Sequence, residues 1–192
     1  SESWNGTNWT ETNNLNQARQ LSSMAGASNT SALVYGGNAP PATVNTELWN
    51  GSNWTEVNNL PSARTYVMGF GTATAAISAG GTPPDYLADT EIWNGTNWTE
   101  GNNLNTAKAY GTGQGTSTSG LVSGGASSPE PRTGNVQSYN GTNWTEVSGL
   151  NTARASIAGS GADSTSSLVF GGEGPGNPLA NTEKWNGSVS AK

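Results

Sequence analysis

Short apolar runs recur along this chain, separated by polar segments rich in glycine. The runs cover residues 33–35, 76–78, 121–123 and 168–170, and each is followed by a pair of glycines. This is the pattern of a strand that is buried between neighbours and then broken. The runs are too short for helices, and no longer stretch keeps a 3.6-residue apolar period. The pattern therefore predicts strands and almost no helix.

A second pattern predicts a tight hairpin. Residues 46–49 and 53–56 alternate in polarity on either side of Asn50-Gly51. Asn-Gly is the strongest short hairpin signal, because both residues tolerate a positive φ. The same dipeptide stands at the corresponding place in every unit described next.

The chain is built from a repeat of about 45 residues. The motif WNGTNWTE at Trp4 returns at later positions with spacings of 45, 44, 46 and 46 residues. Its later copies begin at Trp49, Trp93, Tyr139 and, in decayed form, Trp185. The basic residues Arg19, Arg64, Lys108 and Arg154 follow the same spacing, and so do the four glycine pairs. A period of this length is typical of solenoids and propellers.

One unit predicts four strands, which we call a (63–72), b (74–80), c (89–93) and d (97–101). The order of a Gly-Gly pair, an aromatic residue, a Trp and a basic residue resembles the kelch repeat. Gly81, Trp93, Trp98 and Lys108 carry the resemblance. It implies a β-propeller, and such short, nearly identical units are similar to those of phage-encoded or environmental kelch-like proteins. The Asn-Gly turn, a tighter aromatic spacing and the small number of units depart from the family pattern.

The repeat count predicts one all-β domain over residues 1–192, a four-bladed propeller of four-stranded antiparallel blades. Small residues support so narrow a ring, because Gly-x-Gly triplets at 69–71, 113–115 and 159–161 align with Ala25. We expect closure through residues 7–11, which supply the outer strand of the last blade. Residues 1–4 then compete with 183–185 for one strand position. We expect a monomer, and two chains that form an eight-bladed ring are the alternative.

Composition removes several chemistries. The 192 residues include no Cys and no His, with 7 basic and 13 acidic side chains and a net charge of −6. Disulfides, zinc fingers, thiol nucleophiles and Ser-His-Asp relays are excluded. The kelch resemblance includes copper oxidases that use His, Tyr and Cys, and two of these residue types are absent. We therefore expect no enzyme, cofactor or metal, no nucleic-acid partner and no membrane insertion.

The repeated aromatic and basic residues have two interpretations each. Exposed indoles could stack on sugars, but in so polar a chain we expect them to pack between blades. The basic residues could form an anion site, but glutamates recur on strands c and d, so we expect structural ion pairs. The residues assigned to structure are Trp4, Trp9, Trp49, Trp54, Trp93, Trp98, Tyr139, Trp144, Trp185, Arg19, Arg64, Lys108 and Arg154.

The loops between strands b and c differ from unit to unit, and repeat proteins place recognition in such segments. In an a-b-c-d meander these loops share one end of the propeller with the d-to-a connections. The candidate ligand-binding residues on this face are Asp85, Tyr86, Glu130, Arg132 and Glu173. Tolerated drift in exposed loops is the alternative explanation.

These patterns predict a noncatalytic binding or display module that recognises a protein or a surface glycan through one loop face. A multivalent lectin with one sugar site per blade is the first alternative. A structural component of a virus particle or fibre is the second. The resemblance to phage-encoded proteins implies an extracellular or virion-associated location.

Overall fold

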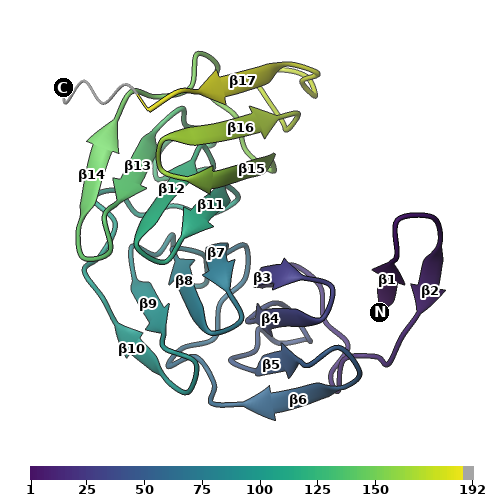
Figure 1. Cartoon of the computed structure of the whole chain (residues 1–192). Helices are drawn as coiled ribbons and strands as arrows, with labels where there is room; N and C mark the ends of the chain where they lie inside the picture. Colours follow the sequence, from purple (N-terminus) through teal and green to yellow (C-terminus); the bar gives the residue numbers. More distant parts are fainter. Residues whose placement is uncertain (188–192) are drawn as a thin grey trace.

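The computed structural model describes residues 1–187 and contains strands but no helix within them. Four antiparallel sheets are arranged as the blades of a four-bladed β-propeller, which confirms the predicted all-β architecture (Figure 1). Because no helix is present in this range, none of its segments meets the length and apolarity needed for a membrane-spanning helix.

Each blade begins with the strand nearest the axis and proceeds outward. Blade 1 contains β3 (Ser23–Ser28), β4 (Ser31–Tyr35), β5 (Thr46–Trp49) and β6 (Trp54–Val57). Blade 2 contains β7 (Met68–Thr72), β8 (Ala75–Ala79), β9 (Thr90–Trp93) and β10 (Trp98–Glu100). Blade 3 contains β11 (Thr112–Thr116), β12 (Ser119–Ser123), β13 (Val136–Tyr139) and β14 (Trp144–Val147). Blade 4 contains β15 (Ala158–Asp163), β16 (Ser166–Phe170) and β17 (Thr182–Trp185).

The innermost strands are shorter than predicted. Strand a of the second unit was expected from residue 63, but β7 begins at Met68. The residues before it contain Arg64, which is buried, and Tyr66, whose φ is +54°. A left-handed residue interrupts an extended strand, so this segment forms part of the connection instead.

The predicted closure of the ring is wrong. β2 (Trp9–Glu11) does not complete blade 4 but pairs with β1 (Glu2–Trp4) as a separate two-stranded sheet. Figure 1 shows this hairpin beside blade 1 and an opening between blade 1 and blade 4. The Asn5-Gly6 turn joins the two strands locally, and hydrogen bonds from Asn13 to Ser52 and Asn53 hold the hairpin against blade 1. Blade 4 consequently has three strands in the part of the chain that the structure describes.

Two rows of backbone hydrogen bonds run from blade to blade near the axis. In the first row, N–H groups of Tyr66, Tyr110 and Ser156 each donate to the corresponding carbonyl of the preceding blade, at 2.8 to 3.3 Å. In the second row, the second glycine of each pair donates to the carbonyl of the basic residue in the following blade. These bonds are Gly37 to Arg64, Gly81 to Lys108 and Gly125 to Arg154, at 2.8 to 3.0 Å. The repeat therefore fixes the blade-to-blade contact as well as the blade.

The core lies between successive blades. Trp98 of blade 2 packs edge-on against Tyr35 of blade 1, with ring centroids 4.8 Å apart. Trp144 of blade 3 packs in the same way against Phe70 of blade 2. Their indole N–H groups donate to the hydroxyls of Thr46 and Thr90 in the preceding blade. The outer strands of blades 2 and 3 therefore each supply one indole that joins two blades.

Blades approach closely enough at the inner strands to require glycine. A Cβ built on Gly69 would lie 2.0 Å from the Tyr35 hydroxyl of blade 1. The corresponding residue of blade 1 is Met24, whose side chain is 63% exposed. Blade 1 thus lacks the close neighbour that blades 2, 3 and 4 have at this position.

We predict that Gly69→Ala lowers the free energy of unfolding by about 1–3 kcal/mol, because its methyl group overpacks the contact with Tyr35. Met24→Ala, at the same repeat position, should change the stability of the single chain by less than about 0.5 kcal/mol, because Met24 is exposed there. Urea unfolding followed by tryptophan fluorescence measures both values. Equal effects of the two substitutions would contradict the tight approach of blade 2 to blade 1.

Candidate functional site

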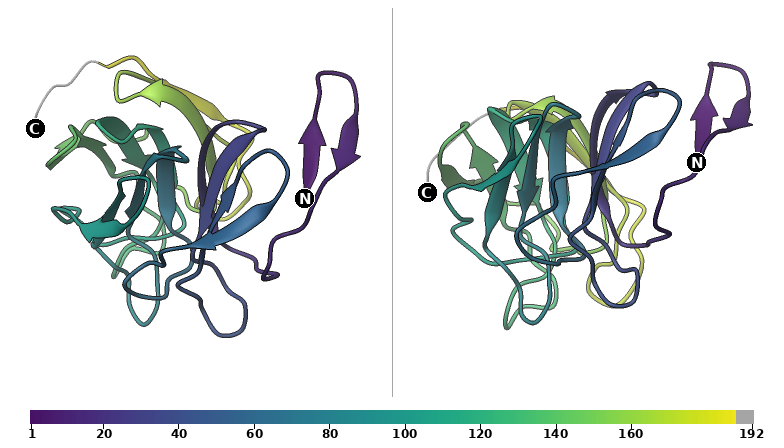
Figure 2. Two further views of the ribbon diagram at one scale, coloured as in Figure 1. Left: turned by 60° about the horizontal axis from the view of Figure 1, so that its bottom comes forward. Right: turned by 90° about the horizontal axis from the view of Figure 1, so that it is seen from below.

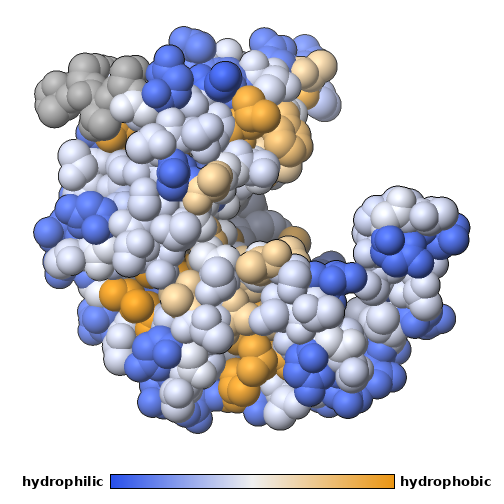
Figure 3. Space-filling view, viewed as in Figure 1, coloured by the Kyte–Doolittle hydropathy of each residue, from blue (hydrophilic) through white to orange (hydrophobic). Residues whose placement is uncertain are grey.

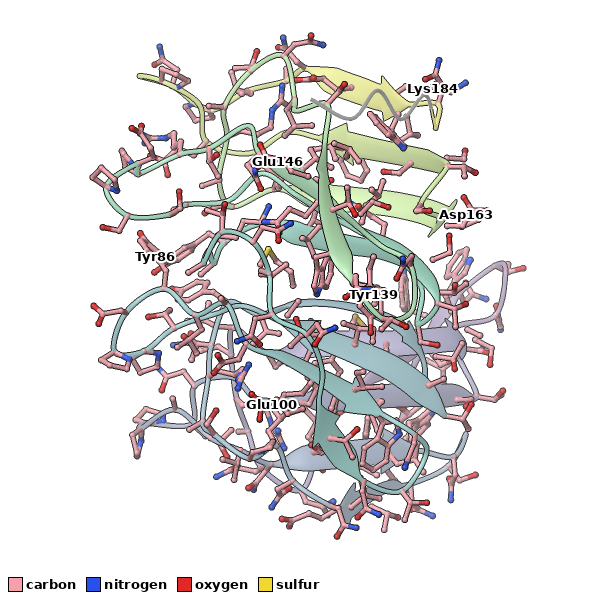
Figure 4. All side chains as sticks on the ribbon, turned by 90° about the vertical axis from the view of Figure 1, so that its left-hand side faces the viewer. Tyr86, Glu100, Tyr139, Glu146, Asp163 and Lys184 are labelled. Carbon is pink, nitrogen blue, oxygen red and sulfur yellow. The ribbon has the colours of Figure 1, made fainter. Side chains whose placement is uncertain are left out.

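The variable b-to-c loops lie at one end of the propeller. Each loop starts beside a d-to-a connection, through bridges that pair Asn38 with Gln20, Thr82 with Thr65, Ala126 with Ala109 and Glu173 with Ala155. Figure 2 shows the long loops projecting from the same side of the blades. In Figure 4, Tyr86 lies among these loops, whereas Asp163 lies at the strand turns of the opposite end. We call the first end the loop face.

Three tyrosines gather on the loop face over blades 2 and 3. The Tyr66 and Tyr110 rings lie with their centroids 4.0 Å apart at an interplanar angle of 35°. The Tyr86 ring meets Tyr110 edge-on at 6.4 Å. All three side chains are half-buried, so ring surface is left for a ligand. We call this group the tyrosine cluster.

The backbone places two of these rings side by side. Tyr66 and Tyr110 occupy equivalent positions, two residues after Arg64 and Lys108, and have φ values of +54° and +61°. The Tyr110 N–H donates to the Tyr66 carbonyl at 3.3 Å, which fixes their spacing. Tyr86 comes from the b-to-c loop of blade 2 and completes the cluster.

A pocket of about 480 Å³ adjoins the cluster. Tyr86 and Tyr110 line it together with the carboxylate-bearing Asp85 and the hydroxyl-bearing Thr82 and Thr106. Partial burial and the neighbouring phenols raise the pKa of Tyr110, so its hydroxyl stays protonated at neutral pH and can donate a hydrogen bond. Aromatic faces beside a few polar groups are the usual composition of a small-ligand site.

The structure separates the five candidate residues of the loop face. It brings Asp85 and Tyr86 together at the pocket. Arg132 instead forms an ion pair with Glu173, which links the loops of blades 3 and 4. Glu130 is exposed in the blade 3 loop, where its carbonyl accepts from the Ser127 N–H. Only the first two residues therefore belong to the tyrosine cluster and its pocket.

Sequence reasoning missed Tyr66 and Tyr110. A signal was present, because the position two residues after each basic landmark reads Leu21, Tyr66, Tyr110 and Ser156. This variation in an otherwise constant unit could have marked the position. Its importance depends on the left-handed conformation and the row of hydrogen bonds, which the repeat pattern does not reveal.

The repeated basic residues do not form a cationic ring. Within residues 1–187, Arg19, Arg64 and Arg154 pair with the strand c glutamates Glu47, Glu91 and Glu183 of their own blades. The three guanidinium groups are buried, and the strand d glutamates Glu11, Glu56, Glu100 and Glu146 are exposed. A buried charge requires a partner, so these pairs fix the connection to its blade.

Lys108 differs from the three arginines. The residue at the glutamate position of its blade is Gln137, and the Lys108 ammonium donates to the Val122 and Asn135 carbonyls and to the Asn135 side chain. Burial lowers the pKa of Lys108 to about 7. The expected glutamate partner is therefore absent in the third unit.

We predict that the stability of the protein rises with pH between about 7 and 9 because of Lys108. Its pKa is lower in the folded chain than in the unfolded chain, so the unfolded state binds more protons over this range. Protonation at lower pH then costs stability. The double variant Lys108→Arg, Gln137→Glu restores the ion pair of the other blades, and its urea midpoint should vary less between pH 7 and 9. An identical pH dependence of variant and wild type would contradict this assignment.

Most repeated aromatic residues lie between blades and are therefore unavailable as a sugar platform. Trp49, Trp93, Trp98, Tyr139 and Trp144 are buried, and Trp54 and Trp185 are half-buried. Trp4 and Trp9 of the N-terminal hairpin are exposed, against the expectation that the whole series packs inside. Their exposure follows from the separate position of the hairpin.

No family model matches the chain, and no curated protein matches its sequence. Among residues 1–187, no group of three or more acidic side chains is arranged to hold a metal ion.

Proposed function

We propose that the protein is a noncatalytic recognition module of the kelch-like type, which binds a surface glycan or a protein through its loop face. The single observation that supports this is the tyrosine cluster, where side chains from two blades and one variable loop converge beside a pocket. Tyrosines supply rigid contact area and a polar tip, which suits recognition of either ligand class.

The cluster favours one site per chain over one site per blade. Blades 1 and 4 carry Leu21 and Ser156 where blades 2 and 3 carry Tyr66 and Tyr110. The two aromatic residues also need neighbouring blades to stack. A multivalent lectin would repeat the same group in each unit, so we regard that alternative as weaker.

We also propose that the protein is a display module, located outside the cell or mounted on a particle. A stable scaffold with one variable end is suited to present a single recognition surface. The polar loop face and the net charge of −6 favour a ligand that is not itself strongly acidic.

We predict that Tyr86→Ala and Tyr110→Ser each weaken binding of a ligand found by glycan-array or protein-library screening, by about tenfold or more. Serine is chosen for position 110 because Ser156 adopts the same left-handed conformation in blade 4. Titration calorimetry should give one ligand per chain.

Glu130→Ala is the matched control, because it alters the same face outside the pocket. Four equivalent sites per chain would favour the lectin alternative. Binding that survives both tyrosine substitutions would place the site elsewhere.

A further inference from the structure

The large exposed apolar side chains of residues 1–187 gather at the two ends of the row of blades. Trp4 and Trp9 lie on the N-terminal hairpin, Leu21 and Met24 on the open side of blade 1, and Leu168 and Phe170 on the open side of blade 4. Figure 3 shows apolar surface at the edge of the opening. The chain has few large apolar residues, and these six are exposed at the two ends of the row of blades.

The same repeat position is buried wherever another blade follows. Leu33, Ile77 and Leu121 of blades 1 to 3 have no exposed surface, whereas Leu168 of blade 4 is 41% exposed. What covers the first three is the inner face of the next blade. The partner that fits blade 4 is therefore another blade of this repeat. Within the described chain, blade 1 is the blade whose face toward a preceding blade is uncovered.

Blade 4 also lacks one indole. In the preceding interface, Trp144 of strand d packs with Ile77, Val122 and Tyr139. The repeat-equivalent residues Leu121, Val169 and Trp185 line a pocket between blades 3 and 4, where residues 1–187 place no strand d. Val136 replaces the hydroxyl acceptor Thr90, so apolar contact alone would hold a ring there. The pocket matches the environment of a strand d tryptophan.

The N-terminal hairpin carries the spare tryptophan. Trp9 on β2 is the repeat equivalent of Trp54, Trp98 and Trp144, and it is 65% exposed. Asn13, which follows β2, bonds to the turn of blade 1, as Asn58 bonds to the turn of blade 2. β2 thus stands in the place of strand d of a blade that would precede blade 1.

The backbone groups at the two ends are complementary. The first hydrogen-bonded row ends at the Leu21 N–H on blade 1 and at the Ser156 carbonyl on blade 4. The second row ends at the Arg19 carbonyl on blade 1 and at the Gly172 N–H on blade 4. Each end offers one donor and one acceptor in the order that the opposite end requires.

We propose that two copies of this chain join head to tail, with β2 of one copy adding to β17 of the other. Trp9 then enters the pocket beside Trp185, and blade 1 covers Leu168 and Phe170. In a two-fold pair both contacts form at once and no end stays free. β17 keeps its place through the Glu183–Arg154 ion pair, so β2 exchanges its partner β1 for β17.

A second copy fits better than closure of one chain on itself. The three interfaces within the chain share the same hydrogen bonds and leave an opening between blades 1 and 4, so the single chain does not cover its own two ends. Met24 also stands where the tight approach of blades 2 to 4 requires glycine. Met24 opposite Phe170 needs a wider contact, which a flexible thioether can fill.

The exchange can be tested with a reversible lock, because the chain contains no cysteine. Glu2 and Glu11 face each other across β1 and β2, so Glu2→Cys, Glu11→Cys can form a disulfide that keeps the hairpin closed. Light scattering after size exclusion should give twice the 19.6 kDa chain mass for wild type and for the reduced variant. The oxidised variant should be a monomer. The proposal would be overturned if wild type stayed monomeric or exceeded the mass of a dimer. It would also be overturned if oxidation left the mass of the variant unchanged.

Substitutions on the two sides of the proposed contact test whether Trp9 and Leu168 form it. Trp9→Ala and Leu168→Asp should each weaken dimerisation at least about 30-fold, since each removes or charges a residue buried only in the pair. Thr142→Asp, on an exposed turn of blade 3, is the charge-matched control. Circular dichroism should show that all three variants fold.

Mixing the two contact variants distinguishes a head-to-tail pair from other pairings. The Leu168→Asp copy retains Trp9, and the Trp9→Ala copy retains an intact blade 4, so one complete contact can form between them. The other contact carries both defects, but a contact that one defect has already broken loses nothing more from a second, so the mixture should dimerise more strongly than either variant alone. If each variant alone is monomeric and the mixture is monomeric too, the two ends do not bind each other and the proposal fails.

Discussion

The fold depends on one contact, the indole of the outer strand of blades 2 and 3, which lies between its own blade and the preceding one. Trp98 and Trp144 bury their rings against Tyr35 and Phe70 and bond to threonine hydroxyls across the interface. An indole buries about 150–250 Å². In a chain with only 32% hydrophobic residues, this repeated contact supplies the apolar area that aliphatic side chains would otherwise provide.

Polar interactions determine how the blades are spaced. Buried guanidinium groups attach each d-to-a connection to a strand c glutamate, and two rows of backbone hydrogen bonds then connect successive blades. Such pairs specify geometry more reliably than they add stability. The third unit shows that the arrangement tolerates a substitute, since Lys108 finds carbonyl and amide acceptors where the other blades have a carboxylate.

The proposed recognition and the proposed assembly both use positions where the repeat departs from itself. The tyrosine cluster forms where two adjacent units carry Tyr66 and Tyr110 at a position that is Leu21 and Ser156 elsewhere. The proposed assembly uses Met24, which replaces glycine in the first unit, and Trp9, which belongs to an incomplete unit. The constant positions build the scaffold, and the exceptions carry what is specific to this protein.

The sequence by itself determined the strands, the hairpins, the four units and the candidate loop face, because each rests on local signals that recur at a fixed period. Asn-Gly turns and Gly-Gly breaks act within a few residues, so their effect can be deduced without the fold. It also offered Asp85 and Tyr86 as candidates for a ligand site, since their loop is variable and its end of the blade follows from the meander.

Only the tertiary structure decided the shape of the ring and the members of the site. Whether β2 completes blade 4 depends on the angle between blades, which arises from close approaches such as that of Gly69 to Tyr35. The stacking of Tyr66 on Tyr110 depends on two left-handed residues brought together from neighbouring blades. Both outcomes join residues far apart in the chain, and a local pattern carries no information about the distance between them.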